Sequence, residues 1–433
     1  MKDFITADGR LAQSSPGLLV VLTLVVTSCL SACPDSSPPP VDAGDGDGDG
    51  DGDGDGDGDA GAIVDAGAAD AGSEPEPRDD PTGARATAPL QVGRSQHTAT
   101  LLADGRVLVA GGESASGEML TSVEVFDPVS ESWTSVTSLP VARANHTATL
   151  LADGSVLFVG GARSNQNSAP SPHDVVATAL IYHVDDGPVT TIPIAPRAGH
   201  HALPLSDGTV LIVGGSNDEI GSACTSVPNC HYGKALATAE IFDPATQTFA
   251  PTGSMVGPRI LFGAVLLDDG TPLVVGGAND STSIDRVEAF VQGGFVTRAP
   301  LAQDRFRPTV VTLGTGAVLA AAGKIANVTP IGETEIYDPT TDVWSAGPEI
   351  GAPRTGASGL TLQSGNALVI GGFDQTTGDL LDEVLLFHQR SLRWTTLGPL
   401  ATPRASATAT LLDDGRVLIV GGLGAGASCE IAE

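Results

Sequence analysis

An all-β fold made of seven repeated units is predicted by three observations on this sequence. An Arg recurs along the chain, a Gly lies eleven residues after each Arg, and a second Gly lies seven residues further on. All seven copies keep this spacing without an insertion or a deletion, which marks a true structural repeat. The 55 Gly and 30 Pro residues of the chain favour many short strands joined by turns.

The frame of the repeat is defined by two sets of residues. The arginines that open it are Arg94, Arg143, Arg197, Arg259, Arg305, Arg354 and Arg404. The glycines that close it are Gly112, Gly161, Gly215, Gly277, Gly323, Gly372 and Gly422.

Each copy contains the pattern of a four-stranded sheet. In the first copy, residues 98–112 read as a strand, an Asp-Gly turn and a second strand, because Gly accepts a positive φ without steric cost. A third strand follows in residues 122–128 and ends at Asp-Pro, since Pro has no backbone donor. An aromatic residue, Trp133, marks the fourth strand.

The repeat resembles the kelch repeat, whose period is about 50 residues. The resemblance is carried by Arg-x-x-His, Gly-Gly, Val-Glu-Val-Phe-Asp-Pro and the Trp that follows. The resemblance covers residues 82–433 and implies a seven-bladed β-propeller with four antiparallel strands per blade. Repeat 2 departs from it at His183-Val184, repeat 4 at Phe290-Val291 and repeat 5 at Ala322-Gly323. The last copy lacks a fourth strand, and residues 86–90 resemble one, so we expect the N-terminal segment to complete the final blade.

The first 33 residues have the pattern of an export signal. An apolar run at residues 17–26 is too short to span a bilayer, and it leads to Leu30-Ser-Ala-Cys33. These four residues resemble the lipobox of bacterial lipoproteins, which implies cleavage before Cys33 and its acylation. Cys29 ends a poorer match, and an ordinary secretory signal is the alternative. Pro34 after the cysteine favours the outer membrane or the cell surface over the inner membrane, with the periplasmic face left open.

Residues 34–81 are predicted to be a disordered acidic tether. An Asp-Gly alternation runs from Asp45 to Asp59, where like charges repel and no apolar surface can be buried. The alternation imitates the start of an EF-hand loop, but its twelfth position is Gly56 and not Glu. We therefore expect no cofactor, and at most weak association of Ca²⁺ with the tether.

The remaining composition narrows the partners. The net charge of −31 repels the phosphates of nucleic acid, so we expect no nucleic-acid binding. We also expect the protein to be a monomer. Cys224 and Cys230 bracket a short loop that a disulfide would close in an oxidising compartment, and no second ligand pair at zinc spacing accompanies them. Cys429 is left over.

Two sets of repeated polar residues have alternative interpretations. The seven arginines would form either an anion site at the channel mouth or buried pairs with recurrent third-strand glutamates, and we favour pairing because buried ions need partners. The glutamates are Glu124, Glu240, Glu288, Glu335 and Glu430. His97, His146 and His200 share one repeat position and are interpreted as structural, with a metal site as the alternative.

The sequence shows no convincing catalytic set. The kelch fold also hosts copper radical enzymes resembling galactose oxidase, which use two Tyr, two His and a Cys linked to one Tyr. Tyr182 and Tyr337 occupy packing positions of the third strand, so this chain resembles such a propeller without the copper site. Fold alone does not confer activity.

Function is therefore expected in the loops between second and third strands. The two longest, at residues 162–177 and 216–237, share one face of the propeller. Residues expected to recognise a ligand there are Asn165, Asn167, His173, Asn217, Asp218, His231 and Tyr232. We predict an exported, lipid-anchored module that binds a protein or a glycan, with an extracytoplasmic oxidase or glycan-active enzyme, or a structural envelope component, as alternatives.

Overall fold

The computed structural model describes residues 80–433, except 164–174, 185–186, 218–233, 280–281, 326–330 and 375. The predicted signal segment, the lipidation of Cys33, the tether up to residue 79 and the Cys224–Cys230 disulfide lie outside the described residues. No helix in the described part of the chain is long and apolar enough to cross a membrane.

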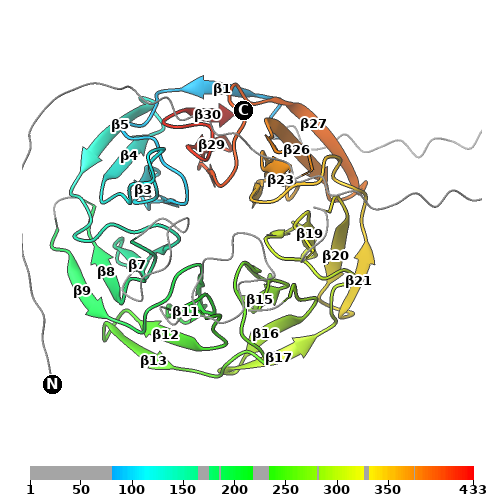
Figure 1. The fold of residues 1–433 in the computed structure, drawn as a ribbon, viewed down its shortest axis with the longest axis horizontal. Helices are drawn as coiled ribbons and strands as arrows, with labels where there is room; N and C mark the ends of the chain where they lie inside the picture. Colours follow the sequence, from blue (N-terminus) through cyan, green and yellow to red (C-terminus); the bar gives the residue numbers. More distant parts are fainter. Residues whose placement is uncertain are drawn as a thin grey trace, which may run out of the picture. The chain divides into compact units, whose positions relative to one another are not determined.

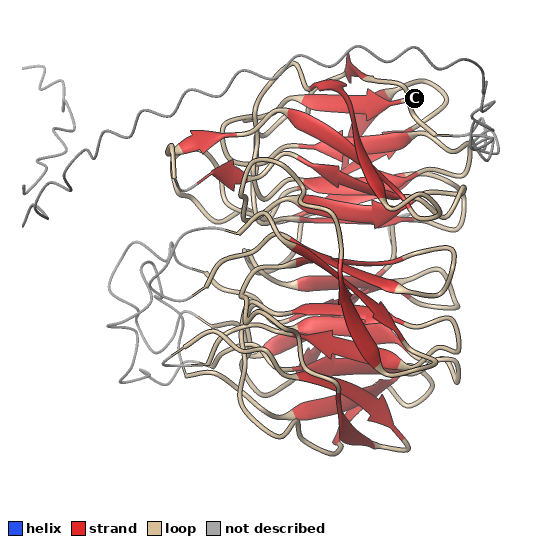
Figure 2. Ribbon diagram, turned by 90° about the vertical axis from the view of Figure 1, so that its right-hand side faces the viewer, coloured by secondary structure: helices blue, strands red, loops and turns tan. Residues whose placement is uncertain are grey.

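The described residues form seven four-stranded antiparallel sheets arranged as blades around a central axis (Figure 1). In blades 1 to 6 the strands run from the inner to the outer edge in chain order, and in blade 7 the first strand of the chain lies outermost. The predicted seven-bladed all-β propeller is therefore confirmed. Figure 2 shows the blades from the side, with short turns on one face and longer loops on the other. We call these faces the turn face and the loop face.

The strands of blades 1 to 4 are as follows. Blade 1 contains β2 (Thr98–Leu101), β3 (Val107–Ala110), β4 (Val123–Asp127) and β5 (Ser132–Val136). Blade 2 contains β6 (Thr147–Leu150), β7 (Val156–Val159), β8 (Thr178–Tyr182) and β9 (Thr190–Pro193). Blade 3 contains β10 (His201–Pro204), β11 (Val210–Val213), β12 (Ala239–Asp243) and β13 (Thr248–Pro251). Blade 4 contains β14 (Gly263–Leu266), β15 (Pro272–Val275), β16 (Val287–Val291) and β17 (Gly294–Arg298).

Blades 5 to 7 complete the ring. Blade 5 contains β18 (Thr309–Thr312), β19 (Val318–Ala321), β20 (Thr334–Asp338) and β21 (Val343–Ala346). Blade 6 contains β22 (Ser358–Thr361), β23 (Ala367–Ile370), β26 (Glu383–His388) and β27 (Arg393–Pro399), and its loop carries a small hairpin of β24 (Phe373–Asp374) and β25 (Asp379–Leu380). Blade 7 contains β28 (Thr408–Leu411), β29 (Val417–Val420), β30 (Cys429–Ala432) and, as its outermost strand, β1 (Ala84–Thr87).

Ring closure is made by the two ends of the propeller, as the sequence predicts. β1 pairs antiparallel with β30, from Ala84 opposite Ala432 to Thr87 opposite Cys429 (Figure 1). The backbone N–H of Thr82 donates to the carbonyl of Glu433 over 2.8 Å and extends the ladder. This arrangement covers the edge of β30 that would otherwise expose unpaired backbone groups.

The apolar core lies between neighbouring blades. All four residues of β3 are buried, as are those of β29, which explains the nearly continuous apolar runs of the second strands. Val107 and Val109 of blade 1 pack in one cluster with Leu418 and Val420 of blade 7. Each blade therefore depends on its neighbours for burial of its apolar surface.

The glycine doublets allow the blades to approach closely. Gly111 has a φ of 63°, and a Cβ added there would lie 2.5 Å from the carbonyl oxygen of Arg143 in the next blade. A larger residue at Gly111 would have to move backbone atoms, so this glycine allows the next blade to approach closely. Repeat 5 has Ala322 at the equivalent position, also with a positive φ of 59°.

Hydrogen bonds from outer aromatic residues also join neighbouring blades. The indole N–H of a fourth-strand tryptophan donates to a carbonyl that ends the preceding blade, and the pairs are Trp133 with Ala88, Trp344 with Ala299 and Trp394 with Pro348. Blade 2 has Val189 at the tryptophan position. Its Tyr182 hydroxyl donates instead to the equivalent carbonyl, that of Thr137, over 2.5 Å.

Replacing Tyr182 by phenylalanine should therefore lower the free energy of unfolding by about 1–1.5 kcal/mol, because one buried hydrogen bond between blades is lost. Urea denaturation followed by tryptophan fluorescence measures this change. The variant Y182F/V189W recreates the Phe126–Trp133 pair of blade 1 and should recover the loss. Equal stability of wild type and Y182F would contradict the assigned role.

Candidate functional site

The seven repeat arginines are buried inside the blades, each at most 1% exposed. Arg94 donates from Nη1 to the carbonyls of Gly111 (2.9 Å) and Ser122 (3.0 Å), and from Nη2 to Glu124 (2.5 Å). Its guanidinium therefore ties the first, second and third strands of blade 1 together. A group buried in this way cannot bind an anion at the channel mouth.

Six of the seven arginines contact a glutamate of the same blade. The pairs are Arg94–Glu124, Arg197–Glu240, Arg259–Glu288, Arg305–Glu335, Arg354–Glu383 and Arg404–Glu430. Several of these carboxylates also accept backbone N–H groups of the connection that enters the blade, as Glu335 does from Ala302 over 2.7 Å. The buried charges are thus paired and hydrogen-bonded, as burial requires.

Arg143 of blade 2 is the exception in the repeat. Leu180 stands at the position that Glu124 has in blade 1, and no described carboxylate forms a salt bridge with Arg143. Its guanidinium donates to the carbonyl of Gly160 (3.0 Å) and to the carbonyl and hydroxyl of Thr178 (3.3 and 3.4 Å). Burial, together with the charge of Arg163, lowers the pKa of Arg143 to about 10.

The three repeated histidines link adjacent blades. Nε2 of His146 shares a hydrogen bond with the Thr98 hydroxyl (3.0 Å), and His200 does the same with Thr147 (3.0 Å). His97 makes the corresponding bond to Thr408 (2.9 Å), which joins blade 1 to blade 7 across the closure. The three rings therefore lie at separate blade junctions, and the described residues contain no group of three His, Cys, Asp or Glu that could hold a metal ion.

Burial keeps these imidazoles neutral. Desolvation, aided by the charge of Arg94, lowers the pKa of His97 to about 3. Desolvation likewise holds the pKa values of His146 and His200 well below their ordinary range. None of the three is suited to act as an acid or base near neutral pH.

The described tyrosines do not fit a copper radical site. The Tyr182 hydroxyl is bound to the Thr137 carbonyl, and the Tyr337 hydroxyl donates to Asp342 (2.8 Å). Burial and the bond to Asp342 raise the pKa of Tyr337 above its ordinary value. Tyr232, the third tyrosine of the chain, and the adjacent His231 lie outside the described residues.

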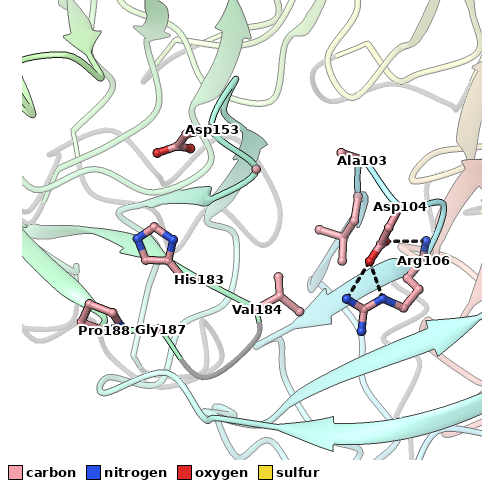
Figure 3. A pocket seen from close by; sticks show the side chains of 10 residues that line it. Ala103, Asp104, Arg106, Asp153, His183, Val184, Gly187 and Pro188 are labelled. Atoms are coloured by element: carbon pink, nitrogen blue, oxygen red, sulfur yellow. Dashed lines mark hydrogen bonds and ion pairs between the residues drawn. The ribbon is translucent and has the colours of Figure 1, made fainter.

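A pocket of about 510 Å³ opens on the turn face between blades 1 and 2 (Figure 3). Asp104 and Arg106 form an ion pair on one side, and His183 lies on the other (Figure 3). Hydrogen bonds from Ser155 lower the pKa of Asp153, a further acid of the lining. The pocket lies where repeat 2 has His183-Val184 in place of Asp-Pro. This departure is visible in the sequence, but the sequence alone does not indicate a cavity there.

The loop face has a regular rim around the central axis, formed by one backbone position of each repeat. Two residues after each repeat arginine the backbone has a positive φ, at Gln96, Asn145, Gly199, Leu261, Arg307, Gly356 and Ser406. Neighbouring blades are joined here by backbone hydrogen bonds, such as Asn145 N–H to Gln96 O (3.1 Å) and Gly199 N–H to Asn145 O (2.9 Å). The side chains of this rim differ from blade to blade while the backbone repeats.

A groove of about 500 Å³ lies on the loop face between the loops of blades 7 and 1, and we call it the 7–1 groove. It is lined by Arg94, Ser95, Glu113, Ser114, Ala115, Ser116, Gly117, Gly422, Leu423, Gly424 and Gly426. Gln96 donates from Nε2 to Oε2 of Glu113 (3.3 Å), and Asn145 donates to Oε1 of Gln96 (2.6 Å). Burial raises the pKa of the Glu113 carboxyl, so this carboxylate is partly desolvated.

Asn217 is the described member of the set predicted to recognise a ligand. It is half-buried at the base of the blade 3 loop, where its backbone N–H donates to the carbonyl of Lys234 (3.1 Å). The other members, Asn165, Asn167, His173, Asp218, His231 and Tyr232, lie outside the described residues. Sequence reasoning did not identify Gln96 or Glu113. The signal for Glu113 is a carboxylate at a repeat position that is neutral in five other repeats.

Comparison with known proteins agrees with this architecture. A model of the Kelch motif matches residues 94–140. Alpha-scruin and Beta-scruin of Limulus polyphemus are each 36% identical over 56 residues, which is 13% of this chain. The chain spans only 6% of the length of these curated relatives.

Solved structures resemble the propeller as a whole. A fungal alcohol oxidase of the AA5 family, in complex with copper, matches with a TM-score of 0.62 and 14% identity over 81% of this chain and 76% of its own. The structure titled "Structure of YjhT" matches with a TM-score of 0.52 and 15% identity over 72% of this chain and 99% of its own. At such identities the likeness shows the fold. The chain is therefore a seven-bladed propeller that contains a Kelch motif and has a copper-bound fungal alcohol oxidase among its structural neighbours.

Proposed function

We propose that this protein is an exported, lipid-anchored interaction module whose propeller binds a protein partner through the loop face. The observation that carries the proposal is the use of the repeated polar residues within the scaffold. Six of the seven arginines pair with glutamates inside their blades, and the buried Arg143 donates to backbone carbonyls. The histidines join neighbouring blades, so neither set is available for chemistry. The side chains on the loop face differ from repeat to repeat. Such variation on a constant scaffold is typical of a recognition surface.

The kind of module also supports a protein partner. Kelch propellers are generally interaction modules that bind proteins. A rigid ring presenting variable loops loses little conformational freedom on binding, which favours affinity. A glycan ligand remains an outcome of the test below.

The proposed anchor is Cys33, with the acidic segment that follows it acting as a spacer between membrane and propeller. An outer-membrane or cell-surface location follows from the lipobox and Pro34. Mass spectrometry of the N-terminal peptide of the exported protein tests the proposed anchor. An unmodified Cys33 would contradict the proposal, and a lipid on Cys29 would show that Cys29 is the anchor.

The alcohol oxidase neighbour raises an enzymatic alternative, but its copper chemistry does not fit the described side chains. The hydroxyls of Tyr182 and Tyr337 are held by structural partners, and His146 and His200 are buried at separate junctions. Copper content of the purified protein, with hydrogen peroxide release from sugars or alcohols, separates this alternative from the binding module.

Shortening the loops of blades 2 and 3 is expected to abolish partner binding and leave the propeller stable. Residues 164–174 and 218–233 would be replaced by a Gly-Ser linker of the length that blade 4 uses. We expect the melting temperature to change by less than about 2 °C, because no blade core is altered. Binding to partners found by pull-down and by glycan array should fall below detection.

A matched control shortens the blade 5 loop at residues 326–330 by the same procedure and should keep binding. If the blade 2 and 3 variant binds as wild type does, the recognition surface lies elsewhere. Binding to a glycan on the array, with no protein captured in the pull-down, would show that the ligand is a glycan.

A further inference from the structure

The propeller segment is strongly acidic, and it stays so when the charges paired inside the blades are left out. Residues 91–433 contain 34 acidic and 17 basic residues. Removing the seven repeat arginines and their six glutamate partners leaves 28 acids and ten bases. A surface of this composition attracts a basic partner and speeds its encounter.

Glu113 is placed by the scaffold but is not needed by it. Its repeat position follows the glycine doublet and is occupied in the other repeats by Ala162, Ser216, Ala278, Lys324, Phe373 and Leu423. No frame interaction therefore requires a carboxylate there. A partly desolvated carboxylate is costly to keep, so its presence in the 7–1 groove calls for a function.

The backbone around Glu113 is rigid. Glu113 and Ser95 exchange backbone hydrogen bonds of 2.8 and 2.9 Å, and Glu113 also forms a β-bridge with Met119. The loop that follows is closed on itself, since the Ser114 hydroxyl accepts the N–H of Glu118 (3.1 Å) and contacts the Ser116 hydroxyl (2.8 Å). The carboxylate is thus presented in one place, which limits the entropy lost when a ligand binds.

Hydrogen bonding leaves one side of the carboxylate available. Gln96 reaches Oε2, and Asn145 fixes the orientation of the Gln96 amide. Oε1 receives no hydrogen bond from a described residue. An ammonium or guanidinium group would supply donors there and neutralise the charge.

The walls of the groove suit the aliphatic stem of a lysine or arginine side chain whose charged group lies at Glu113. Leu423 is 49% exposed at the groove and can pack against an aliphatic stem. The serine hydroxyls and the backbone of Gly424 and Gly426 are neutral. The cation among the lining residues, Arg94, is 1% exposed and is paired with Glu124.

We propose that the 7–1 groove binds a lysine or arginine side chain of the protein partner, with Glu113 as its counter-ion. This inference rests on the proposed function as a protein-binding module and names the chemistry of the partner. It places the anchor of recognition at the junction where the two ends of the propeller meet.

The test measures binding of an acetylated, amidated octapeptide in which three lysines alternate with Gly and Ser. Fluorescence anisotropy would compare the purified wild-type protein with the variants E113Q and E118Q. Glu118 is an exposed acid of the same loop, so E118Q removes the same charge outside the groove. The acidic tether is present in all three proteins, and its contribution cancels.

We expect E113Q to weaken binding about fivefold or more and E118Q to change it less than about twofold. The arginine version of the peptide should bind comparably, and the version with acetylated lysines should lose affinity for wild type to the level of E113Q. Equal effects of E113Q and E118Q would mean general electrostatic attraction and would overturn the inference. Loss of partner binding in the loop-shortened protein alongside unaltered binding by E113Q would overturn it while the proposed function stands.

Discussion

Replacing Arg94 by methionine is expected to lower the free energy of unfolding by about 3–5 kcal/mol, because Glu124 is left as a buried charge without its cation. Glu124 is 1% exposed and cannot recover hydration in the folded state. The substitution also removes the donors to the carbonyls of Gly111 and Ser122. Such a loss is a large part of the stability of an ordinary domain.

The same substitution at Arg143 should cost less, about 1–3 kcal/mol. Arg143 donates to the equivalent carbonyls, those of Gly160 and Thr178, but Leu180 replaces the glutamate. R143M therefore controls for the loss of the carbonyl contacts, and its difference from R94M isolates the effect of the stranded carboxylate.

Urea denaturation of R94M, R143M and the double variant R94M/E124L measures these effects. The double variant should be more stable than R94M, since no unpaired charge remains and apolar side chains fill the space. Equal losses in R94M and R143M would show that the carbonyl contacts, and not the ion pair, determine the stability of a blade.

The repeat frame predicts the ring, its strands and its closure because each element depends on local chemistry. Asp-Gly turns set the hairpins, apolar runs mark the buried second strands, and Asp-Pro ends the third strand. The closing strand is also visible, since residues 86–90 repeat a pattern found before the second arginine. The structure places β1 at Ala84–Thr87, which overlaps that segment at Ala86 and Thr87.

The glutamate that pairs with Arg354 is one that the repeat pattern of the sequence does not predict. Glu383 lies two residues before the position of the other glutamates and was not among those expected to pair. A β-bulge between Val384 and Leu385 shifts the register of β26 against β27 in this region. The extra residue of the bulge is Leu397 in β27, and the pairing of β26 with β23 has no shift. Glu383 therefore reaches Arg354 from a different repeat position, which the spacing of the other glutamates does not predict.

The histidine contacts and the 7–1 groove depend on how blades pack against each other. His97 and Thr408 are 311 residues apart, and their contact follows from ring closure rather than from any local motif. Glu113 likewise meets the blade 7 loop at Gly422–Gly426 only because the ring closes. The groove lies between two short loops, so loop length in the sequence gives no indication of it.

Mild acid is expected to unfold the propeller through His97, His146 and His200. The pKa of each is depressed in the folded state, to about 3 for His97, against about 6.5 in the unfolded chain. Between these values the unfolded state binds protons that the folded state does not, so stability is complete above pH 6.5 and falls as the pH falls. Each histidine contributes about 1.4 kcal/mol per pH unit, and the three together about 4 kcal/mol per pH unit.

Thermal unfolding measured at half-unit steps from pH 7.5 to pH 4 would show this slope. The control is the variant H97A/H146A/H200A, because blades 6 and 7 already carry Ala357 and Ala407 at the same repeat position. The triple variant should be less stable at pH 7.5, having lost three contacts between blades, yet its stability should depend much less on pH. If wild type and variant show parallel pH profiles, the imidazoles are not the groups that take up protons on unfolding, and the closure contact between His97 and Thr408 tolerates a charged ring.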